Sequence, residues 1–316
     1  MTDHPAPPRI LVVGAGAIGG YFGGRLLAAG RDVTFLVRPG RAAQLARDGL
    51  VIRSPCGDVH VPAPPHVLAD DLRAPFDLVL LSCKAYDLDG AMTAMAAAVG
   101  AATMILPLLN GLRHLDALDA RFGAARVLGG QCAILATLDP AGTVRHLGAM
   151  HALSFGRRDG TPVPGIAAMM QNAGFDGRMS GTILHDMWEK WVLLATMAGS
   201  TCLLRAAVGD IMAAGGRDFV RALLAECCAV AAAAGYAPRA EALARTEAML
   251  LAAGAPTTAS MLRDIEQGGR IEADHIIADL LARHAAAGPD TAAPLLRLVL
   301  LHLRAYEARR ARSAAA

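Results

Sequence analysis

The feature that most constrains the fold is a glycine-rich turn inside a strand–turn–helix–strand pattern over residues 9–37. The apolar, β-branched segment RILVV is followed by Gly14, Gly16 and Gly19 in the spacing GxGxxG, then by a helical stretch and a second apolar run. In this spacing the first glycine makes a tight turn, the second lets the backbone approach a pyrophosphate, and the third lets helix and sheet pack closely. The phosphates then lie on the free N–H groups that begin the helix. The pattern predicts a dinucleotide-binding unit rather than a merely structural turn.

The residues after the second strand indicate which dinucleotide is expected. NAD sites usually carry an acidic residue roughly 20 residues after the fingerprint, where it holds the ribose 2′-hydroxyl. This chain has no acidic residue between Val33 and Arg47, and its strand ends at Arg38 with Arg41 close behind. A guanidinium suits a 2′-phosphate, so the sequence favours NADPH/NADP+. The alternative is that both arginines are solvated loop charges.

Two later apolar runs place polar side chains where such a sheet binds its ligands. The run PFDLVLLSCKAYD predicts a buried strand followed by Lys84, and MILPLLNGLRHL predicts another that ends at Asn110. Ligands of open α/β sheets bind outside the carboxyl ends of the strands, which makes both residues candidate cofactor contacts. An ordinary Asn-Gly turn is the alternative for Asn110. Beyond about residue 125, alternating segments with turns predict antiparallel strands that close the edge of the sheet.

The second half of the chain has a helical pattern. Apolar residues recur at helical spacing in alanine-rich segments that glycine and proline separate. These segments cover residues 217–235, 239–253, 257–268, 271–287 and 291–311. We therefore expect an α/β protein with an N-terminal Rossmann dinucleotide-binding domain over residues 1–180 and an all-helical C-terminal domain over residues 181–316, where substrate binding and catalysis are expected.

Composition argues against several other kinds of partner. The formal net charge is +2, from 30 basic and 28 acidic residues, so nucleic acid and anionic membranes are not expected as partners. The start MTDHPAPPRI lacks the layout of a signal peptide, and the uncharged run Trp191–Leu204 is shorter than the ~20 residues that span a bilayer. Cysteine and histidine spacings indicate reduced thiols and no metal site. We expect a cytoplasmic protein with a small-molecule partner.

Several separate segments together resemble the ketopantoate reductase (2-dehydropantoate 2-reductase) family over almost the whole chain. They are GAGAIGG, LSCKAY, LLNGL, WEKW and ASMLRDIEQGGRIEADHI. The resemblance implies an NADPH-dependent oxidoreductase that reduces a 2-oxo acid to a 2-hydroxy acid. The family's default reaction converts ketopantoate to pantoate, as in pantothenate biosynthesis. The family's Rossmann and helical domains agree with the order of elements expected above.

The resemblance also implies roles for individual residues. Lys190 resembles the family's general acid and Glu272 its acidic partner. Ser260 is similar to the ligand of the substrate carboxylate, and Asn110 to a residue between the nicotinamide and the substrate. Arg38 and Lys84 would contact the 2′-phosphate region. The implied cofactor-binding set is Gly14, Gly16, Ala17, Ile18, Gly19, Arg38, Lys84 and Asn110.

The chemistry expected of Lys190 agrees with that role. Hydride transfer to a 2-oxo group builds negative charge on its oxygen, and a nearby ammonium both stabilises this charge and delivers the proton. The alternative is an ordinary interfacial lysine whose stem packs while its head reaches water.

Three positions depart from the family pattern. Leu194 and Ala198 lie four and eight residues after Lys190, where family members carry asparagines that bind substrate oxygens, and Val208 replaces a further asparagine. An apolar wall discriminates less strongly than a hydrogen-bonding one. Ketopantoate remains the default substrate, and the substrate-binding positions Leu194 and Ala198 give a close alternative, a 2-oxo acid with a more apolar side chain. A non-catalytic NADPH-binding sensor is the alternative, and the apolar helices after residue 217 would also suit a homodimer surface.

Overall fold

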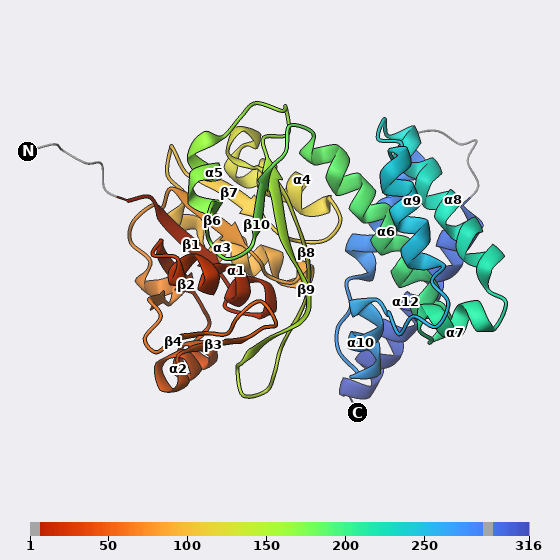
Figure 1. Ribbon diagram of the computed structural model, residues 1–316, viewed down its shortest axis with the longest axis horizontal. Coiled ribbons are helices and arrows are strands. Elements are labelled where there is room, and N and C mark those ends of the chain that lie inside the picture. Colours follow the sequence, from red (N-terminus) through yellow and green to blue (C-terminus); the bar gives the residue numbers. More distant parts are fainter. Residues whose placement is uncertain (1–6, 287–292, 316) are drawn as a thin grey trace, which may run out of the picture. The chain divides into compact units, whose positions relative to one another are not determined.

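The computed structural model describes residues 7–286 and 293–315, which divide into two compact units. The first unit runs to Leu109 and resumes over His114–Ile183. The second unit contains Asn110–Arg113 and the chain from Leu184 onward. The class is α/β, with sheets in the first unit and helices in the second (Figure 1).

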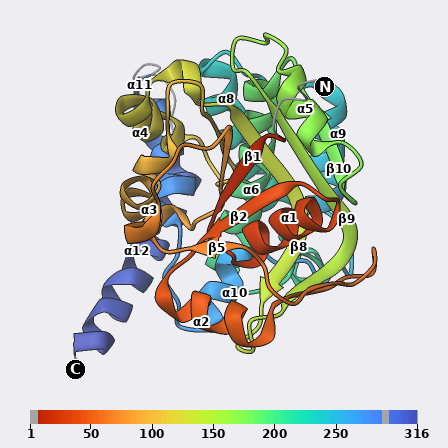
Figure 2. The ribbon, with the colours of Figure 1, turned by 90° about the vertical axis from the view of Figure 1, so that its left-hand side faces the viewer.

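The first unit is built on a five-stranded sheet in which every neighbouring pair is parallel. Its spatial order is β5-β2-β1-β6-β7, and Figure 2 shows β1, β2 and α1 close to the viewer. The strands β1 and β6 are almost wholly buried, as their continuous apolar sequences require. The strand bounds are β1 Arg9–Val13, β2 Asp32–Leu36, β5 His66–Val67, β6 Leu78–Leu81 and β7 Met104–Pro107. The predicted Rossmann arrangement is confirmed.

Helices follow several strands of the first unit. The glycine-rich turn leads directly from β1 into α1, as the spacing of its glycines predicts. The helix bounds are α1 Ala17–Ala28, α2 Pro39–Asp48, α3 Leu88–Ala94, α4 Arg113–Phe122 and α5 Pro164–Met170.

The strands after residue 125 form a second sheet rather than an edge of the first. The long hairpin of β8 (Gly129–Leu138) and β9 (Val144–Gly156) is antiparallel, as expected. However, β9 also pairs in parallel with β3 (Leu50–Arg53) and β10 (Asp176–Met179), and β3 pairs with β4 (Val59–Val61). These pairings place the hairpin in a separate sheet, and an isolated bridge between Ile105 and Val127 links the segment before it to β7.

The second unit is helical throughout its described elements. In α8 the buried residues recur every three or four positions, which is the pattern of one apolar helix face. The longer α6 is buried around most of its circumference, which explains its almost continuous apolar sequence. The bounds are α6 Ile183–Leu204, α7 Val208–Ala213, α8 Arg217–Ala233, α9 Ala240–Leu250, α10 Ser260–Glu266, the π-helix η5 Asp274–Ala278, α11 Asp279–Ala286 and α12 Pro294–Ala315.

The described chain carries its cysteines as free thiols. All six cysteines are free, and burial raises the pKa of Cys202 and Cys227 to about 12. Over residues 7–286 and 293–315, no group of three histidine, cysteine or acidic side chains is placed to hold a metal ion. Within the same ranges, no helix has both the length and the apolar character needed to cross a membrane.

We predict that Gly19→Ala destabilises the first unit by about 3 kcal/mol or more, because overpacking at fixed backbone is costly. A Cβ at this position would overlap the carbonyl oxygen of Gly14 and the hydroxyl of Ser82. Gly16→Ala is the matched control, since no atom lies within 4 Å of its added Cβ. Thermal unfolding followed by far-UV circular dichroism measures both variants. Equal melting temperatures for the two would contradict the close approach at Gly19.

Candidate active site

Three parallel strands end side by side at the edge of the first sheet that carries the glycine-rich turn. The strand β1 pairs with β2 on one side and β6 on the other, so the segments that follow all three leave the same edge. Gly14 has a φ of +92°, a conformation that other residues rarely adopt, and its N–H donates to the Leu36 carbonyl at 2.9 Å. The Ser82 hydroxyl donates to the Val13 carbonyl at 3.0 Å and fixes the turn from the β6 side.

The start of α1 is suited to hold an anion. Its N-cap is Gly16, which offers no side chain to the first N–H groups, and its first turn contains no acidic residue. A helix leaves its first N–H groups without intrahelical partners and carries a partial positive charge at this end. The backbone of Gly16, Ala17, Ile18 and Gly19 can therefore offer N–H groups to an anion, and a Cβ at Gly16 would meet no atom within 4 Å.

The Arg41 side chain bonds to backbone carbonyls at and near this turn instead of extending into solvent. Its Nε donates to the Ala15 carbonyl at 2.9 Å, and its Nη1 donates to the Gly142 carbonyl at 2.9 Å. Burial lowers the pKa of this guanidinium, against a smaller opposing effect of Asp139. The sequence suggests that Arg41 either accompanies Arg38 at a 2′-phosphate or is a solvated loop charge, whereas in the structure it bonds one carbonyl of the glycine-rich turn and one in the connection between β8 and β9.

Arg38 and Lys84 lie at the ends of the strands that flank β1. Arg38 follows β2 and is the N-cap of α2, with 78% of its side chain exposed. Lys84 follows β6 and is also exposed. Arg38 forms an ion pair with Asp87 at 3.0 Å. Sequence spacing gave no indication of Asp87, because its partner is distant in the chain.

In the second unit, one tryptophan connects the three segments that carry Asn110, Lys190 and Glu272. The Trp191 indole N–H donates to the Ile276 carbonyl at 2.9 Å, in the interior. Gly111, with a φ of +73°, lies so close that an added Cβ would be 2.6 Å from the His275 carbonyl oxygen and 3.8 Å from the Trp191 ring. The chain neighbours of these three residues are therefore in mutual contact, and Asn110 belongs to the second unit.

Glu272 lies two residues before the first residue of the π-helix η5. Its carbonyl accepts the N–H groups of His275 at 3.1 Å and Ile276 at 3.0 Å, and its side chain is buried. Single π-helical turns frequently occur at functional sites. Burial lowers the pKa of His275, and the nearby Arg113 adds to this shift, while Glu272 is among the carboxylates that oppose it.

Lys190, Leu194 and Ala198 share one face of α6, because residues four apart in a helix lie above one another. Lys190 is half-buried, Leu194 is half-buried and Ala198 is buried. Ser260 opens α10, and the N–H of the preceding residue Ala259 donates to the Thr201 hydroxyl at 3.3 Å. Ser260 is thus anchored near the Ala198 end of α6, roughly 16 Å along the axis from the Lys190 turn.

Residue usage supplies a signal that motif spacing does not. Lys84 and Lys190 are the only lysines of the chain, and its other 28 basic residues are all arginines, out of 30 in total. Lysine differs from arginine in carrying a compact ammonium that releases a proton more readily. A chain that otherwise uses arginine therefore has lysine only at two positions that the family resemblance assigns to the site.

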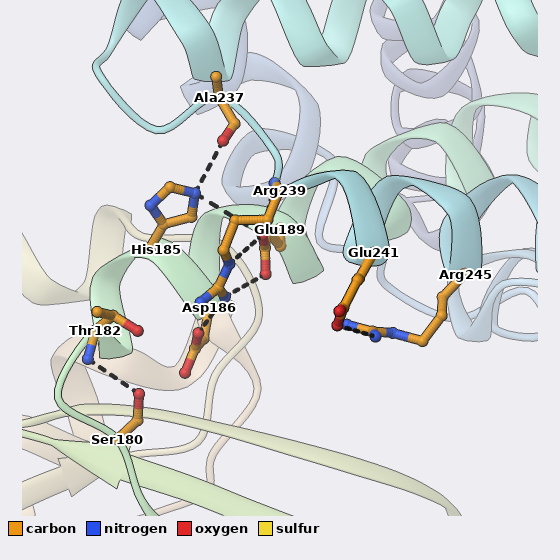
Figure 3. Close-up of polar contacts among 9 residues, drawn as sticks. All are labelled: Ser180, Thr182, His185, Asp186, Glu189, Ala237, Arg239, Glu241 and Arg245. Carbon is orange, nitrogen blue, oxygen red and sulfur yellow. Dashed lines mark hydrogen bonds and ion pairs between the residues drawn. The ribbon is translucent and has the colours of Figure 1, made fainter.

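Arg239 fixes the first turns of α6, directly before Lys190 (Figure 3). Its Nε and its backbone N–H both donate to Glu189 Oε1, at 2.7 and 2.9 Å, and its Nη2 reaches Asp186 and Glu189 Oε2. Burial raises the pKa of Glu189, but the hydrogen bonds and charge of Arg239 outweigh it and leave the pKa below its ordinary value. The same hydrogen bonds, first to Glu189 and then to Asp186, raise the pKa of Arg239.

We predict that Arg239→Met lowers the free energy of unfolding of the second unit by about 1 to 3 kcal/mol at pH 7, because two largely buried carboxylates lose their counter-ion. A depressed folded-state pKa contributes stability that is present above the unfolded value of about 4.5 and is lost as the pH falls through the folded value. The variant should therefore lose less stability on acidification than the wild type.

Urea unfolding at pH 7 and pH 4 measures the loss of stability of the variant and the wild type. Tryptophan fluorescence reports the unfolding of this unit, because both tryptophans lie on α6. The matched control is Arg245→Met, which removes an exposed pair with Glu241 at 3.7 Å on the neighbouring α9 (Figure 3). Such pairs contribute about 0 to 1 kcal/mol. If the two variants lose equal stability, the proposed contribution of Arg239 is wrong.

Comparison with known proteins identifies the family. The sequence pattern described as "Ketopantoate reductase PanE/ApbA" matches residues 10–160, and the pattern "Ketopantoate reductase PanE/ApbA C terminal" matches residues 182–307. The chain is 36% identical over 306 residues to "Uncharacterized oxidoreductase YkpB" of Bacillus subtilis, covering 95% of this chain and 99% of that protein. It is 28% identical to a 2-dehydropantoate 2-reductase of Halobacterium salinarum, covering 92% and 95%.

Solved structures of similar proteins agree with this family. The crystal structure of 2-dehydropantoate 2-reductase from Geobacter metallireducens is 32% identical, with a TM-score of 0.85 and coverage of 94% of this chain and 99% of that one. D-mandelate dehydrogenase with NADH and anilino(oxo)acetate has the same fold, with a TM-score of 0.85 at 22% identity, over 96% and 99% of the two chains. The chain therefore belongs to the ketopantoate reductase family and is an oxidoreductase that acts on CH–OH groups.

Proposed function

We propose that the protein reduces a 2-oxo acid to the corresponding 2-hydroxy acid, with NADPH held by residues 1–180 and the substrate chemistry carried out by residues 181–316. The observation that carries this proposal is the junction at Trp191, which joins the segments of Asn110, Lys190 and Glu272 within one unit. NADPH, when bound, supplies the hydride. The protein's own residues must then orient the 2-oxo acid and deliver a proton to its oxygen.

Lys190 is the proposed proton donor. Its side chain is half-buried on the long apolar helix α6. The nearest acidic neighbours along the helix are Asp186, one turn earlier, and Glu189, and both are bonded to Arg239. The ammonium is thus available to the oxygen that gains charge during reduction. Glu272 is buried, in the segment whose Ile276 carbonyl accepts the Trp191 indole N–H, and is the proposed acidic partner of Lys190.

NADPH is the proposed cofactor because the phosphate-binding turn is flanked by two cations. Gly16 and the open start of α1 suit the pyrophosphate, and the exposed Arg38 and Lys84 are proposed to contact the 2′-phosphate. Arginine binds phosphate in a bidentate manner, and lysine binds it as a point charge. Asn110 is proposed to lie between the cofactor and the substrate.

The proposed substrate has a side chain more apolar than that of ketopantoate. Leu194 and Ala198 line the same face of α6 as Lys190, and neither offers a hydrogen bond to a substrate hydroxyl. The exposed Ser260, anchored to the far end of this face, is proposed to bind the carboxylate. Ketopantoate, 2-oxo acids with branched alkyl chains and 2-oxo acids with aryl chains form the panel for an NADPH-oxidation assay. Preference for ketopantoate would contradict this part of the proposal.

We predict that Lys190→Ala lowers kcat by about 10²- to 10⁴-fold, the usual contribution of a general acid, and leaves NADPH affinity unchanged. Lys190→Arg keeps the positive charge but not a readily released proton, so it should also lose most of its turnover. Steady-state NADPH oxidation measures kcat, and nicotinamide fluorescence measures affinity. If Lys190→Ala keeps kcat within tenfold of the wild type, Lys190 is not the general acid. If the wild type binds NADPH but turns over no member of the panel, the alternative of a non-catalytic NADPH-binding sensor is favoured.

We predict that the double variant Leu194→Asn with Ala198→Asn shifts kcat/KM toward ketopantoate by about tenfold or more relative to an apolar 2-oxo acid. Asparagine would supply the hydrogen bonds that the present side chains lack. Leu204→Asn is the control, because it lies on the same helix with 47% of the residue exposed. An unchanged order of substrates in the double variant would show that these two positions do not select the substrate.

A further inference from the structure

The sheet edge that carries the phosphate-binding turn contains a carboxylate that the linear sequence does not reveal. No acidic residue follows β2 before Arg47, which favours a phosphorylated dinucleotide. However, β6 lies on the other side of β1, and the segment after it brings Asp87 to Arg38 at 3.0 Å. The acid that the second strand lacks is therefore supplied by the segment after β6.

The two partners of this ion pair differ in their freedom to move. Asp87 ends the short helical turn Ala85–Asp87, its N–H donates to the Lys84 carbonyl at 2.9 Å, and 31% of its side chain is exposed. The Arg38 backbone carbonyl is fixed by the N–H groups of Arg41 and Ala42, but 78% of its side chain is exposed. The carboxylate is thus the more fixed member, and the guanidinium is free to turn from it toward another anion.

We infer that Asp87 sets the balance between NADPH and NADH in this protein: it competes with the 2′-phosphate for Arg38 and accepts a hydrogen bond from the 2′-hydroxyl of NADH. A carboxylate is the usual partner of a free ribose 2′-hydroxyl. The same carboxylate repels a phosphate that approaches the guanidinium. The protein therefore accepts both cofactors, with a smaller preference for NADPH than Arg38 and Lys84 alone would give. This inference rests on the proposed role of Arg38.

The size of the effect follows from the charges. A phosphate of charge −2 about 6 Å from a carboxylate in a water-like medium is repelled by an amount that corresponds to about a tenfold change in affinity. The effect belongs to exposed charges and should shrink as salt is added, since the screening length falls to ~3 Å at 1 M salt. The hydrogen bond to the 2′-hydroxyl of NADH does not share this salt dependence.

The test measures the dissociation constants of NADPH and NADH by nicotinamide fluorescence at low and high salt, with no 2-oxo acid present. Asp87→Asn should bind NADPH about tenfold more tightly at low salt, bind NADH several-fold more weakly, and lose the NADPH gain at high salt. Asp89→Asn is the matched control, because it removes an exposed acid only two residues away, and both of its constants should match the wild type. Arg38→Gln should raise the dissociation constant of NADPH by at least about tenfold and leave that of NADH within about twofold of the wild type.

If Asp87→Asn changes the dissociation constants of NADPH and NADH equally, or changes neither, the inference is overturned while the cofactor proposal stays intact. An unchanged NADPH constant in Arg38→Gln would overturn the assignment of Arg38, and the inference with it. Failure of the wild type to bind either dinucleotide would overturn both. Failure to reduce any 2-oxo acid affects the proposed reaction only, because no turnover is measured here.

Discussion

The hydrogen bond from the Trp191 indole to the Ile276 carbonyl is the interaction on which the arrangement of the second unit depends. It joins the buried helix α6 to the π-helical turn after Glu272, and Gly111 closes against both. Three segments far apart in sequence are held by main-chain contacts one to four residues from the proposed site residues. These contacts are made by a buried ring and by backbone groups rather than by the side chains of the proposed site residues.

The first unit achieves a similar result by different means. Its glycine-rich turn is fixed by the pairing of β1 with β2 and β6, and by bonds from Ser82 and Arg41 to backbone carbonyls. The cations proposed to meet the ligand, Arg38 and Lys84, remain on the surface. In both units, the contacts that fix the backbone are thus made by residues other than those proposed to bind the ligands. Arg41 and Arg38 illustrate the division, since they are three residues apart and face entirely different surroundings.

Much of the fold followed from local patterns in the sequence. The continuous apolar runs predicted β1, β6 and β7, and the glycine spacing predicted the turn and α1, because these features depend on residues close together in the chain. The hairpin of β8 and β9 was also predictable, but its membership of a second sheet was not. That membership depends on β3 and β10, whose short sequences carry little signal of their own partners.

The candidate site was predictable to a similar extent. Lys190, Glu272 and Asn110 were found through motifs, yet the roles of these residues stay proposals. The Asp87–Arg38 pair, the Arg41 brace and the Trp191 junction were missed because each joins residues that sequence separates and only tertiary structure brings together.

The rarity of lysine has a consequence for handling the protein. Reagents that couple to side-chain amines find only Lys84 and Lys190, and of these Lys84 is exposed while Lys190 is half-buried on α6. Attachment of a dye or a solid support through its side-chain amines would therefore be nearly site-directed. It would occur first at the edge of the sheet beside the glycine-rich turn, so that a routine labelling reaction would report on, and obstruct, the surface beside that turn.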